Sequence, residues 1–451
     1  MDTLKNSVSG AMTTALCSYR WLLKMSRKKA LLVLVGFCTL SVLIHQGTHL
    51  SWLPKSLPFP CTPPGGLREK LIAVAFLKTH KTASSTVQNI FFRFGERHNL
   101  TVALPHHTCE HQFCYPRNFS TRFVHPYTLP SSIVASHMRL NIPELRRLMP
   151  NGTIYVTILR EPAAMFESLF SYYNQYCLSF KRVPNASMDT FLSNPLMYYQ
   201  PQEKFSIYAH NTLVYDLGGD NDHATEDEGY MSDFIQEMES FFSLVMIAEY
   251  FDESLVLLKR LLSWDLEDIV YVKLNMRSQE SKVNVTPALS AKVRAWNTLD
   301  ARLYDHFNTT FWEKVRHLGL GCVEEEVRQL RQAREQLARR CFGGRPQPRS
   351  ATEIRNKELR PWQPSSKVSI VGYDLPSDTG SDICLKLVMP EVQYSKYLLR
   401  KQGLKVRQKT GRRALLPLKS LARGQAQHHL RAQPLHPARG SPIRYWHPIM
   451  N

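Results

Sequence analysis

Acidic residues are scarce at the two ends of this sequence. Of the 451 residues, 57 are Lys or Arg and 38 are Asp or Glu, and the formal net charge is +19. Residues 401–451 hold eleven basic residues and no acidic one, and residues 1–29 hold six basic residues and one acidic one. Residues 30–400 therefore carry only +3. A nucleic-acid-binding domain needs a positive face of its own, so we predict no nucleic-acid partner.

Glycine and paired cysteines are missing where two common kinds of site need them. No glycine occurs between Leu71 and Phe94, which excludes the GxxxxGK[ST] loop of nucleotide-binding proteins. The nine cysteines include no C-x-x-C pair and no Cys/His set with zinc spacing. We therefore predict neither a Walker-type site nor a structural metal.

Charged residues are also absent from Ala30–Ile44, which directly follows the basic run Arg27–Lys29. Gly47–Leu53 extends this apolar stretch to roughly 20 residues, the length that a bilayer core requires. No small-x-small cleavage pattern follows Ile44, so a signal anchor is favoured over a cleaved signal peptide. The basic flank places the N-terminus in the cytosol. We predict a type II membrane protein with a cytosolic tail (1–29), a transmembrane signal anchor (30–50), a Pro- and Gly-rich stem (51–70), a lumenal domain (71–400) and a basic disordered tail (401–451).

The segment beyond the predicted anchor carries features of a secreted protein. Seven of the cysteines lie there, and an odd number in an oxidising lumen leaves at least one free or paired with another chain. That number is compatible with a homodimer. Cys109 and Cys114 are close enough in sequence to close a small loop. The glycosylation pattern N-x-[ST] occurs at Asn99, Asn118, Asn151, Asn185, Asn284 and Asn308.

Apolar runs alternate with helical patterns along the lumenal part. Such alternation predicts an α/β domain with a central, mostly parallel sheet flanked by helices, and ligands then bind beyond the C-terminal ends of the strands. Residues 99–130 and 181–230 look irregular. The expected strands are Leu71–Leu77, Ile133–Ser136, Thr153–Leu159 and Leu244–Ala248, and the expected helices begin or lie at Thr86, Pro162–Tyr176, Asp252–Leu262, Ser290–Phe307 and Val323–Cys341.

Two of the predicted strands end in polar clusters suited to phosphate. The first strand is followed by a loop rich in lysine and hydroxyl groups, Lys78–Ser85, and then by a helix whose free N–H groups attract anions. The strand Thr153–Leu159 ends at Arg160, and Ser168 follows two helical turns later, where the pair could grip a second phosphate. Two separate phosphate-binding clusters suggest a nucleotide phosphorylated at both ends of its ribose. The alternative is an ordinary basic turn between a strand and a helix.

The residues at these strand ends resemble those of sulfotransferases. LKTHKTASST is similar to the 5′-phosphosulfate loop of those enzymes, and ILREPAAMFES is similar to their 3′-phosphate motif. With SHMRLN, IAEYFDESLVLL and PEVQY, they resemble the galactose-3-O-sulfotransferases of the Golgi over residues 71–397. Two departures stand out, because His80 replaces a common proline and Ala83 a common glycine.

This resemblance implies a P-loop-like sulfotransferase fold, a location in the Golgi membrane with a lumenal catalytic domain, and the donor 3′-phosphoadenosine 5′-phosphosulfate. It implies acceptors among the galactose-terminated glycans of glycoproteins, with galactosylceramide as the alternative, and no metal requirement. It also implies roles for individual residues. Lys81 would contact the bridging and sulfuryl oxygens. Thr82, Ser84, Ser85 and Thr86 would hold the 5′-phosphate, and Arg160 and Ser168 the 3′-phosphate. The other donor-binding residues would be Lys78, Thr79, His80, Lys81 and Ala83.

A histidine suits the task of deprotonating the acceptor hydroxyl, because histidine titrates near working pH. We expect His137 to be this base, since it ends a strand at the same sheet edge and matches the histidine of the family's H-M/L-R segment. His80 is the competing candidate, although its place in the donor-binding loop is better suited to shaping that loop or contacting the leaving group. The alternative for His137 is a structural histidine bonded to a loop carbonyl, and Lys78 could bind phosphate or simply cover the strand end.

Two other functions stay open from the sequence. Asp220-Asn221-Asp222 has the D-x-D form of a metal-dependent Golgi glycosyltransferase, although such a triplet in a Gly/Asp-rich loop is more often a turn. A non-enzymatic glycan- or heparin-binding protein could act through the basic tail.

Overall fold

The computed structural model describes residue 61 and residues 69–365, 368–376 and 381–414. Within these ranges, no helix is both long enough and apolar enough to cross a bilayer. The predicted cytosolic tail and signal anchor, and nearly all of the predicted stem, lie outside the described residues. A compact unit begins at Glu69.

Five short parallel strands form the central sheet, in the order β2-β3-β1-β4-β5. Strands β1 and β5 are both buried along their whole length, as expected for a sheet that is covered on both faces. The predicted α/β class and its parallel sheet are confirmed. The strands are β1 (Val74–Leu77), β2 (Val102–Ala103), β3 (Ile133–Val134), β4 (Ile154–Leu159) and β5 (Leu244–Ile247).

Strand β1 occupies the centre of the sheet, with β3 on one side and β4 on the other. The chain leaves β1 toward β2 and β3 first and later crosses to β4 and β5. The C-terminal end of β1 is therefore a topological switch point, the place where open α/β sheets bind ligands. An isolated parallel bridge pairs Lys78 with His137 just beyond β1 and β3, so both residues lie at this edge.

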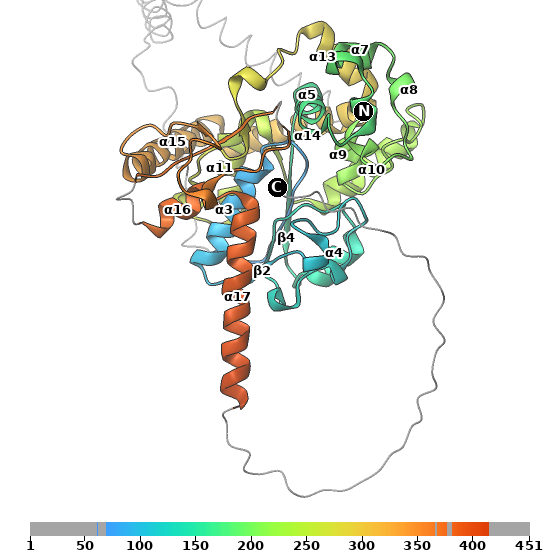
Figure 1. The fold of residues 1–451 in the computed structure, drawn as a ribbon. Helices are drawn as coiled ribbons and strands as arrows, with labels where there is room; N and C mark the ends of the chain where they lie inside the picture. The colour runs from blue at the N-terminus through green and yellow to red at the C-terminus, as the bar shows by residue number, and fades with distance from the viewer. Residues whose placement is uncertain (1–60, 62–68, 366–367, 377–380, 415–451) are drawn as a thin grey trace, which may run out of the picture. The chain divides into compact units, whose positions relative to one another are not determined.

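Helices cover both faces of the sheet (Figure 1). The helices α3 (Ser84–Arg97), α11 (Phe251–Leu262) and α17 (Glu391–Ala414) lie on one side, and α4 (Ile142–Leu148) and α10 (Glu228–Phe241) lie on the other. Helix α3 buries the apolar positions that predicted it, among them Val87, Ile90 and Phe94. Phe91 of α3 stacks on Phe76 of β1 with ring centroids 5.5 Å apart, which fixes the helix directly after the loop Lys78–Ser85.

Hydrophobic periodicity predicted four of the ten remaining helices, which lie over the expected stretches Pro162–Tyr176, Ser290–Phe307 and Val323–Cys341; the stretch Ser290–Phe307 is divided between two helices at Asn297. The segment 181–230, expected to be irregular, instead contains several short helices, because apolar side chains such as Phe191 and Leu213 are buried in the hydrophobic core. Residues 99–130 are largely loops and 3₁₀ turns around β2, as expected. The remaining helices are α5 (Pro162–Tyr173), α6 (Leu178–Lys181), α7 (Met188–Ser193), α8 (Pro195–Tyr198), α9 (Thr212–Asp216), α12 (Leu266–Ile269), α13 (Pro287–Trp296), α14 (Thr298–Leu318), α15 (Leu320–Phe342) and α16 (Asp382–Val388).

A second, antiparallel sheet has the order β6-β8-β7 and was not predicted. Its strands are β6 (Met276–Arg277), β7 (Arg349–Ser350) and β8 (Ile370–Gly372). Strands of two or three residues leave too few positions for an alternating pattern to be recognised. This sheet matters for the candidate site, because Arg277 of β6 lines the same cavity as the loop that follows β1.

Helix α17 runs through residue 400, where we had placed the start of a disordered tail. The cause is a specific contact with the edge strand β2. Gln402 accepts a hydrogen bond from Val102 N at 2.8 Å and donates one to Val102 O at 3.2 Å. These bonds satisfy backbone groups that an uncovered sheet edge would leave open. Residues 401–414 are thus helical, and residues 415–451 lie outside the described part.

The seven cysteines beyond the predicted anchor include one that is free, as their odd number allowed. Cys109 and Cys114 form a disulfide, which confirms the predicted small loop, and Cys341 pairs with Cys384. Cys61 and Cys322 are also disulfide-bonded. The seventh cysteine of this part, Cys177, is free and completely buried, so it is not placed to bond with another chain.

Candidate active site

The loop between β1 and α3 bends through two residues with a left-handed backbone. Lys81 has a φ of 58° and Ala83 a φ of 64°. This conformation costs a residue with a side chain roughly 1 kcal/mol, whereas glycine adopts it freely. The sulfotransferase loop that this segment resembles commonly has glycine at the position of Ala83, and the positive φ supplies the physical reason.

Three hydroxyl groups of this loop hold its own backbone in place. Thr79 Oγ1 donates to Ile158 O at 2.5 Å and lies 2.8 Å from Thr82 Oγ1. Ser84 Oγ donates to Thr79 O at 2.6 Å. Thr79 is completely buried and does not line the adjoining cavity. The side chains of Thr79, Thr82 and Ser84 therefore hold the shape of the loop. Thr82 and Ser84 also line the cavity, whereas Thr79, which we predicted to contact the donor, does not.

Backbone N–H groups at the start of α3 are free to bind an anion. The N–H groups of residues 81–85 have no acceptor among the described residues, and Ala83 at the N-cap provides no side-chain cap. Unpaired N–H groups and the positive end of the helix dipole attract phosphate. Ser85 and Thr86 add hydroxyls that line the same cavity, although Ser85 Oγ donates to Glu391 Oε2 at 2.8 Å and Thr86 Oγ1 accepts from Leu274 N at 3.0 Å.

Basic side chains converge on these N–H groups. Arg160, at the end of β4, donates from its guanidinium to Lys81 O at 2.9 Å, so the two strand ends lie side by side, as one bridging ligand requires. Lys81 Nζ lies 3.7 Å from the centre of the Tyr172 ring. Neither cation forms an ion pair within the part of the chain that the structure describes. Burial, together with the charges of Arg277, Arg160 and Lys78, lowers the pKa of Lys81 to about 7.

Arg277 is a third cation near this group, and its side chain is buried. Its guanidinium pairs with Glu167 of α5 and also donates to Ser281 O at 3.1 Å. Glu167 additionally accepts from Val283 N at 3.1 Å. The pairing holds Arg277 at the cavity wall and leaves Lys81 and Arg160 as the cations without a carboxylate partner among the described residues.

His137 and Lys78 form a closed pair at the ends of β3 and β1. His137 Nδ1 lies 2.8 Å from Lys78 O, and its Nε2 lies 2.7 Å from Lys78 Nζ. A carbonyl only accepts and an ammonium only donates, so Nδ1 carries the proton and Nε2 is the acceptor. Burial and the positive charge of Lys78 place the pKa of His137 well below its usual range.

Glu391, at the start of α17, completes this network. Its Oε2 accepts from Lys78 Nζ at 2.8 Å, and the positive charge of Lys78 contributes to lowering the pKa of Glu391, against the effect of burial, to about 2. Both ring nitrogens of His137 are thus engaged, which is the geometry of the alternative structural role.

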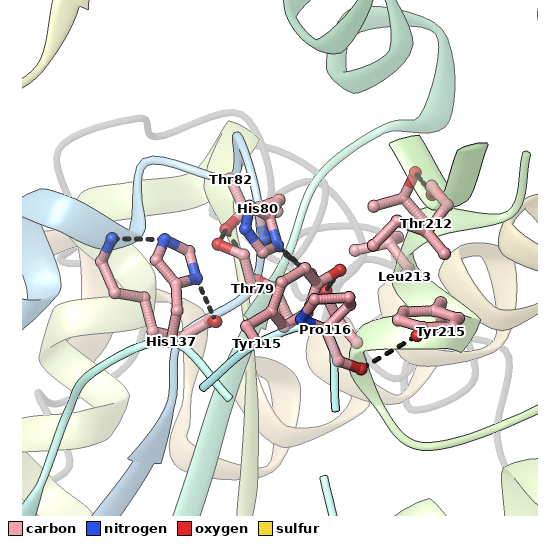
Figure 2. Close-up of polar contacts among 12 residues, drawn as sticks. Thr79, His80, Thr82, Tyr115, Pro116, His137, Thr212, Leu213 and Tyr215 are labelled. Atoms are coloured by element: carbon pink, nitrogen blue, oxygen red, sulfur yellow. Dashed lines mark hydrogen bonds and ion pairs between the residues drawn. The ribbon is translucent and has the colours of Figure 1, made fainter. Parts of the chain in front are cut away.

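His80 makes a different set of contacts, shown in Figure 2. Its ring lies face to face with that of His137, with centroids 4.1 Å apart and 13° between the planes. His80 Nδ1 lies 2.9 Å from Asp216 Oδ1, and His80 N donates to Asp216 Oδ2 at 2.8 Å. Tyr115 donates to Asp216 Oδ1 at 2.8 Å. Nε2 of His80 is buried and has no hydrogen-bond partner among the described residues.

One cavity of about 2330 Å³ collects these groups. It is lined by Lys78, by residues 80–86, and by His137, Arg160 and Ser168. Of the donor-binding residues predicted from sequence, only Thr79 is absent from its wall. The predicted clusters at Lys78–Thr86 and Arg160–Ser168 therefore meet, as the sheet topology required.

Comparison with known proteins agrees with this geometry. A family model described as galactose-3-O-sulfotransferase matches residues 12–402. The chain belongs to the galactose-3-O-sulfotransferase family. It is 63% identical to galactose-3-O-sulfotransferase 3 of Bos taurus over 84% of this chain and 90% of that protein. It is 43% identical to human galactose-3-O-sulfotransferase 2 over 71% and 81% of the two chains, and 40% identical to human galactosylceramide sulfotransferase over 71% and 76%.

As a member of the galactose-3-O-sulfotransferase family the chain is a sulfotransferase, and sequence reasoning missed three of the charged residues at its candidate site. Asp216 lies in the stretch 181–230, which we had considered irregular. Arg277 is on a two-residue strand without a recognisable pattern. Glu391 belongs to PEVQY, a motif that carried the resemblance, but its acidic side chain suggested no contact with an anion-binding loop. PEVQY is the one signal from which any of the three could have been found.

The D-x-D triplet has a role outside this cavity. Asp222 Oδ1 accepts from Tyr199 at 2.7 Å and lies 2.8 Å from His210 Nδ1, while Asp220 Oδ1 accepts from Asp222 N at 3.1 Å. These bonds are those of a loop closed by its own side chains. The triplet does not line the cavity.

The predicted glycosylation sites differ in accessibility. Asn308 is half-buried within α14, and its Oδ1 has no hydrogen-bond partner among the described residues. The other five asparagines are exposed: Asn99, Asn118, Asn151, Asn185 and Asn284.

Proposed function

We propose that this protein transfers the sulfuryl group of 3′-phosphoadenosine 5′-phosphosulfate to the 3-hydroxyl of a terminal β-galactose on glycoprotein glycans with N-acetyllactosamine-type ends. The observation that carries the proposal is the pairing of free backbone N–H groups with two cations that have no carboxylate partner among the described residues, at the switch point of a parallel sheet. Such a site is matched by a donor that carries phosphate at both ends of its ribose.

The donor-binding residues fit this molecule by charge and by position. Unpaired cations in a partly buried site are costly until an anion neutralises them, and Lys81 and Arg160 are two such groups. The N–H groups of residues 81–85 suit the 5′-phosphate, and Arg160 with Ser168 suits the 3′-phosphate. A cavity of about 2330 Å³ exceeds the volume that single small ligands occupy, which leaves room for a sugar beside the donor.

In the reaction the donor supplies an activated sulfuryl group. Like phosphoryl transfer, sulfuryl transfer is an in-line displacement in which charge develops on the leaving oxygen. Lys81 and the N-terminus of α3 stabilise that charge, and no metal is needed for this step. One histidine of the stacked pair His80 and His137 removes the proton from the acceptor hydroxyl.

The nature of the acceptor rests on the relatives. The relatives with 62–63% identity are named galactose-3-O-sulfotransferase 3, whereas those named galactosylceramide sulfotransferase are 40% identical. This difference favours a glycoprotein glycan over a glycolipid as the acceptor. Location belongs to the same proposal: the apolar run at residues 30–44 would anchor the chain in the Golgi membrane, with the catalytic domain in the lumen.

The test is transfer of labelled sulfate from the donor by the purified lumenal domain, with N-acetyllactosamine, lactose and galactosylceramide as acceptors and mapping of the product linkage. We expect 3-O-sulfated galactose, fastest with N-acetyllactosamine, in the presence of EDTA. 3′,5′-ADP should protect the domain from thermal unfolding without metal. Sugar-nucleotide binding with a manganese requirement would instead support a glycosyltransferase, and faster turnover of galactosylceramide would support the glycolipid alternative.

A further inference from the structure

We propose that Asp216 is a positioning residue and that it makes His80, rather than His137, the base that deprotonates the acceptor hydroxyl. This inference rests on the proposed function, which it deepens by assigning the proton transfer to one histidine. Its basis is the difference between the hydrogen bonds of the two stacked imidazoles.

Asp216 fixes the tautomer of His80. A carboxylate accepts hydrogen bonds and has no proton to donate, so His80 Nδ1, at 2.9 Å from Asp216 Oδ1, must carry the hydrogen. Asp216 Oδ2 also accepts from the backbone N–H of the same histidine at 2.8 Å, which ties the ring to the loop that carries it. The lone pair is then on Nε2. This is how an acidic residue orients a catalytic histidine in hydrolase triads.

Nε2 of His80 lacks the partner that a buried acceptor requires. His80 is only 2% exposed, and Nε2 has no hydrogen bond within the described residues. Leaving such an atom unsatisfied is energetically costly, unless a ligand that donates a hydrogen bond completes the site. The phosphosulfate of the donor is fully ionised and offers only acceptor oxygens. A sugar hydroxyl is a donor, and the cavity that His80 lines has room for one.

His137 lacks this freedom. Its Nε2 lone pair accepts from Lys78 Nζ at 2.7 Å, and its Nδ1 proton is donated to Lys78 O. Lys78 itself is only 1% exposed and is held by Glu391. Taking a proton on Nε2 of His137 would require breaking a buried pair, whereas His80 needs no rearrangement.

The proposed step is balanced in atoms and charge. The O3–H bond of galactose breaks and its proton passes to Nε2 of His80 while O3 bonds to sulfur. The bond between sulfur and the bridging oxygen breaks, and its electron pair leaves with the 5′-phosphate as 3′,5′-ADP. The proton on His80 then passes to water.

Asp216→Asn provides a specific test of positioning. The asparagine oxygen would still accept from His80 N, so its NH₂ group would face Nδ1 and favour the tautomer with hydrogen on Nε2, which cannot accept a proton. We expect kcat to fall about 100-fold for Asp216→Asn and at least about 100-fold for His80→Ala, with the Kd for 3′,5′-ADP changed less than about threefold. In ¹⁵N NMR spectra of histidine-labelled protein, the His80 proton should move from Nδ1 to Nε2 in Asp216→Asn.

Asp300→Asn is the matched control. Asp300 is a second fully buried carboxyl group beside α9, where it accepts hydrogen bonds from Leu213 N and Val214 N at 3.1 and 2.9 Å, and within the described residues no hydrogen bond joins it to His80. We expect this variant to lose stability but to keep its kcat. An equal loss of kcat in Asp300→Asn would show that loosening of α9 causes the effect, and it would overturn the assignment of Asp216.

Tyr115→Phe serves if Asp216→Asn does not fold, because it removes only the bond from Tyr115 to Asp216. We expect its kcat to fall about three- to tenfold with 3′,5′-ADP binding intact. Turnover within about fivefold of wild type in His80→Ala, together with a loss of about 100-fold or more in His137→Ala, would reverse the assignment in favour of His137. Absence of sulfate transfer by the wild-type domain would instead contradict the proposed function itself.

Discussion

The unusual pKa of Lys81 predicts that donor-site affinity falls as the pH rises above neutrality. Burial and the charges of Arg277, Arg160 and Lys78 hold this pKa at about 7 in the ligand-free site. A bound bisphosphate neutralises those charges and returns the pKa toward its usual value near 10.4. Binding therefore takes up a proton above pH 7, and by linkage the affinity decreases with increasing pH.

The size of the effect follows from the protonated fraction of Lys81. With a pKa of about 7, about half of the free protein is protonated at pH 7 and about 1% at pH 9, so the Kd for 3′,5′-ADP should rise about fifty-fold between these values. The ligand does not contribute, because phosphate groups with a second pKa near 6 are already ionised. Calorimetry in buffers of different ionisation enthalpy should detect uptake of about 0.9 proton per ligand at pH 8.

Unfolding of the protein would not produce the same increase of the Kd with pH. A lysine whose pKa is lower in the folded than in the unfolded state releases its proton on folding between about pH 7 and 10, so its contribution to the free energy of unfolding increases with pH over that range. Lys81→Arg is the control variant, because guanidinium stays charged throughout and its binding curve should be nearly flat from pH 7 to 9. A Kd of the wild-type protein that changes less than about threefold over that range would refute the reasoning.

Three further predictions concern residues around and outside the site. Glu391→Gln should lower the free energy of unfolding by about 2–4 kcal/mol, because it leaves Lys78 without its carboxylate partner, yet it should tighten 3′,5′-ADP binding by removing a negative charge; unchanged stability in denaturant titration would contradict the ion pair. Ala83→Gly should raise the free energy of unfolding by about 0.5–1 kcal/mol, since glycine tolerates the φ of 64° at this position, and a loss of stability would argue against the left-handed loop. Asn308→Gln should leave the electrophoretic mobility of secreted protein unchanged, whereas Asn118→Gln should increase it by one glycan, and the reverse outcome would place Asn308 at the surface.

The central sheet was predictable because its strands are long enough to carry their own signal. β1, β4 and β5 are apolar runs of four to six residues that each precede a helix, and this order alone indicates a parallel sheet. The second sheet was not predictable, since β6 and β7 have only two residues each and pair with a strand about 20 to 90 residues away. The extension of α17 past residue 400 depends on Gln402 reaching β2, a contact across 300 residues of sequence.

The same distinction between local and distant contacts explains what could be inferred about the site. The loop from Lys78 to Thr86 can be recognised from the sequence, because a strand, a run of lysine and hydroxyl groups and a helix are adjacent there. Whether a histidine serves as a base depends on the partner of each ring nitrogen, and for His80 that partner is Asp216, 136 residues away. The strand pairing that brings Lys78 and His137 together also gives each of them a partner. The position of His137 at a strand end, which made it the first choice from sequence, is thus the feature that occupies its lone pair in the folded protein.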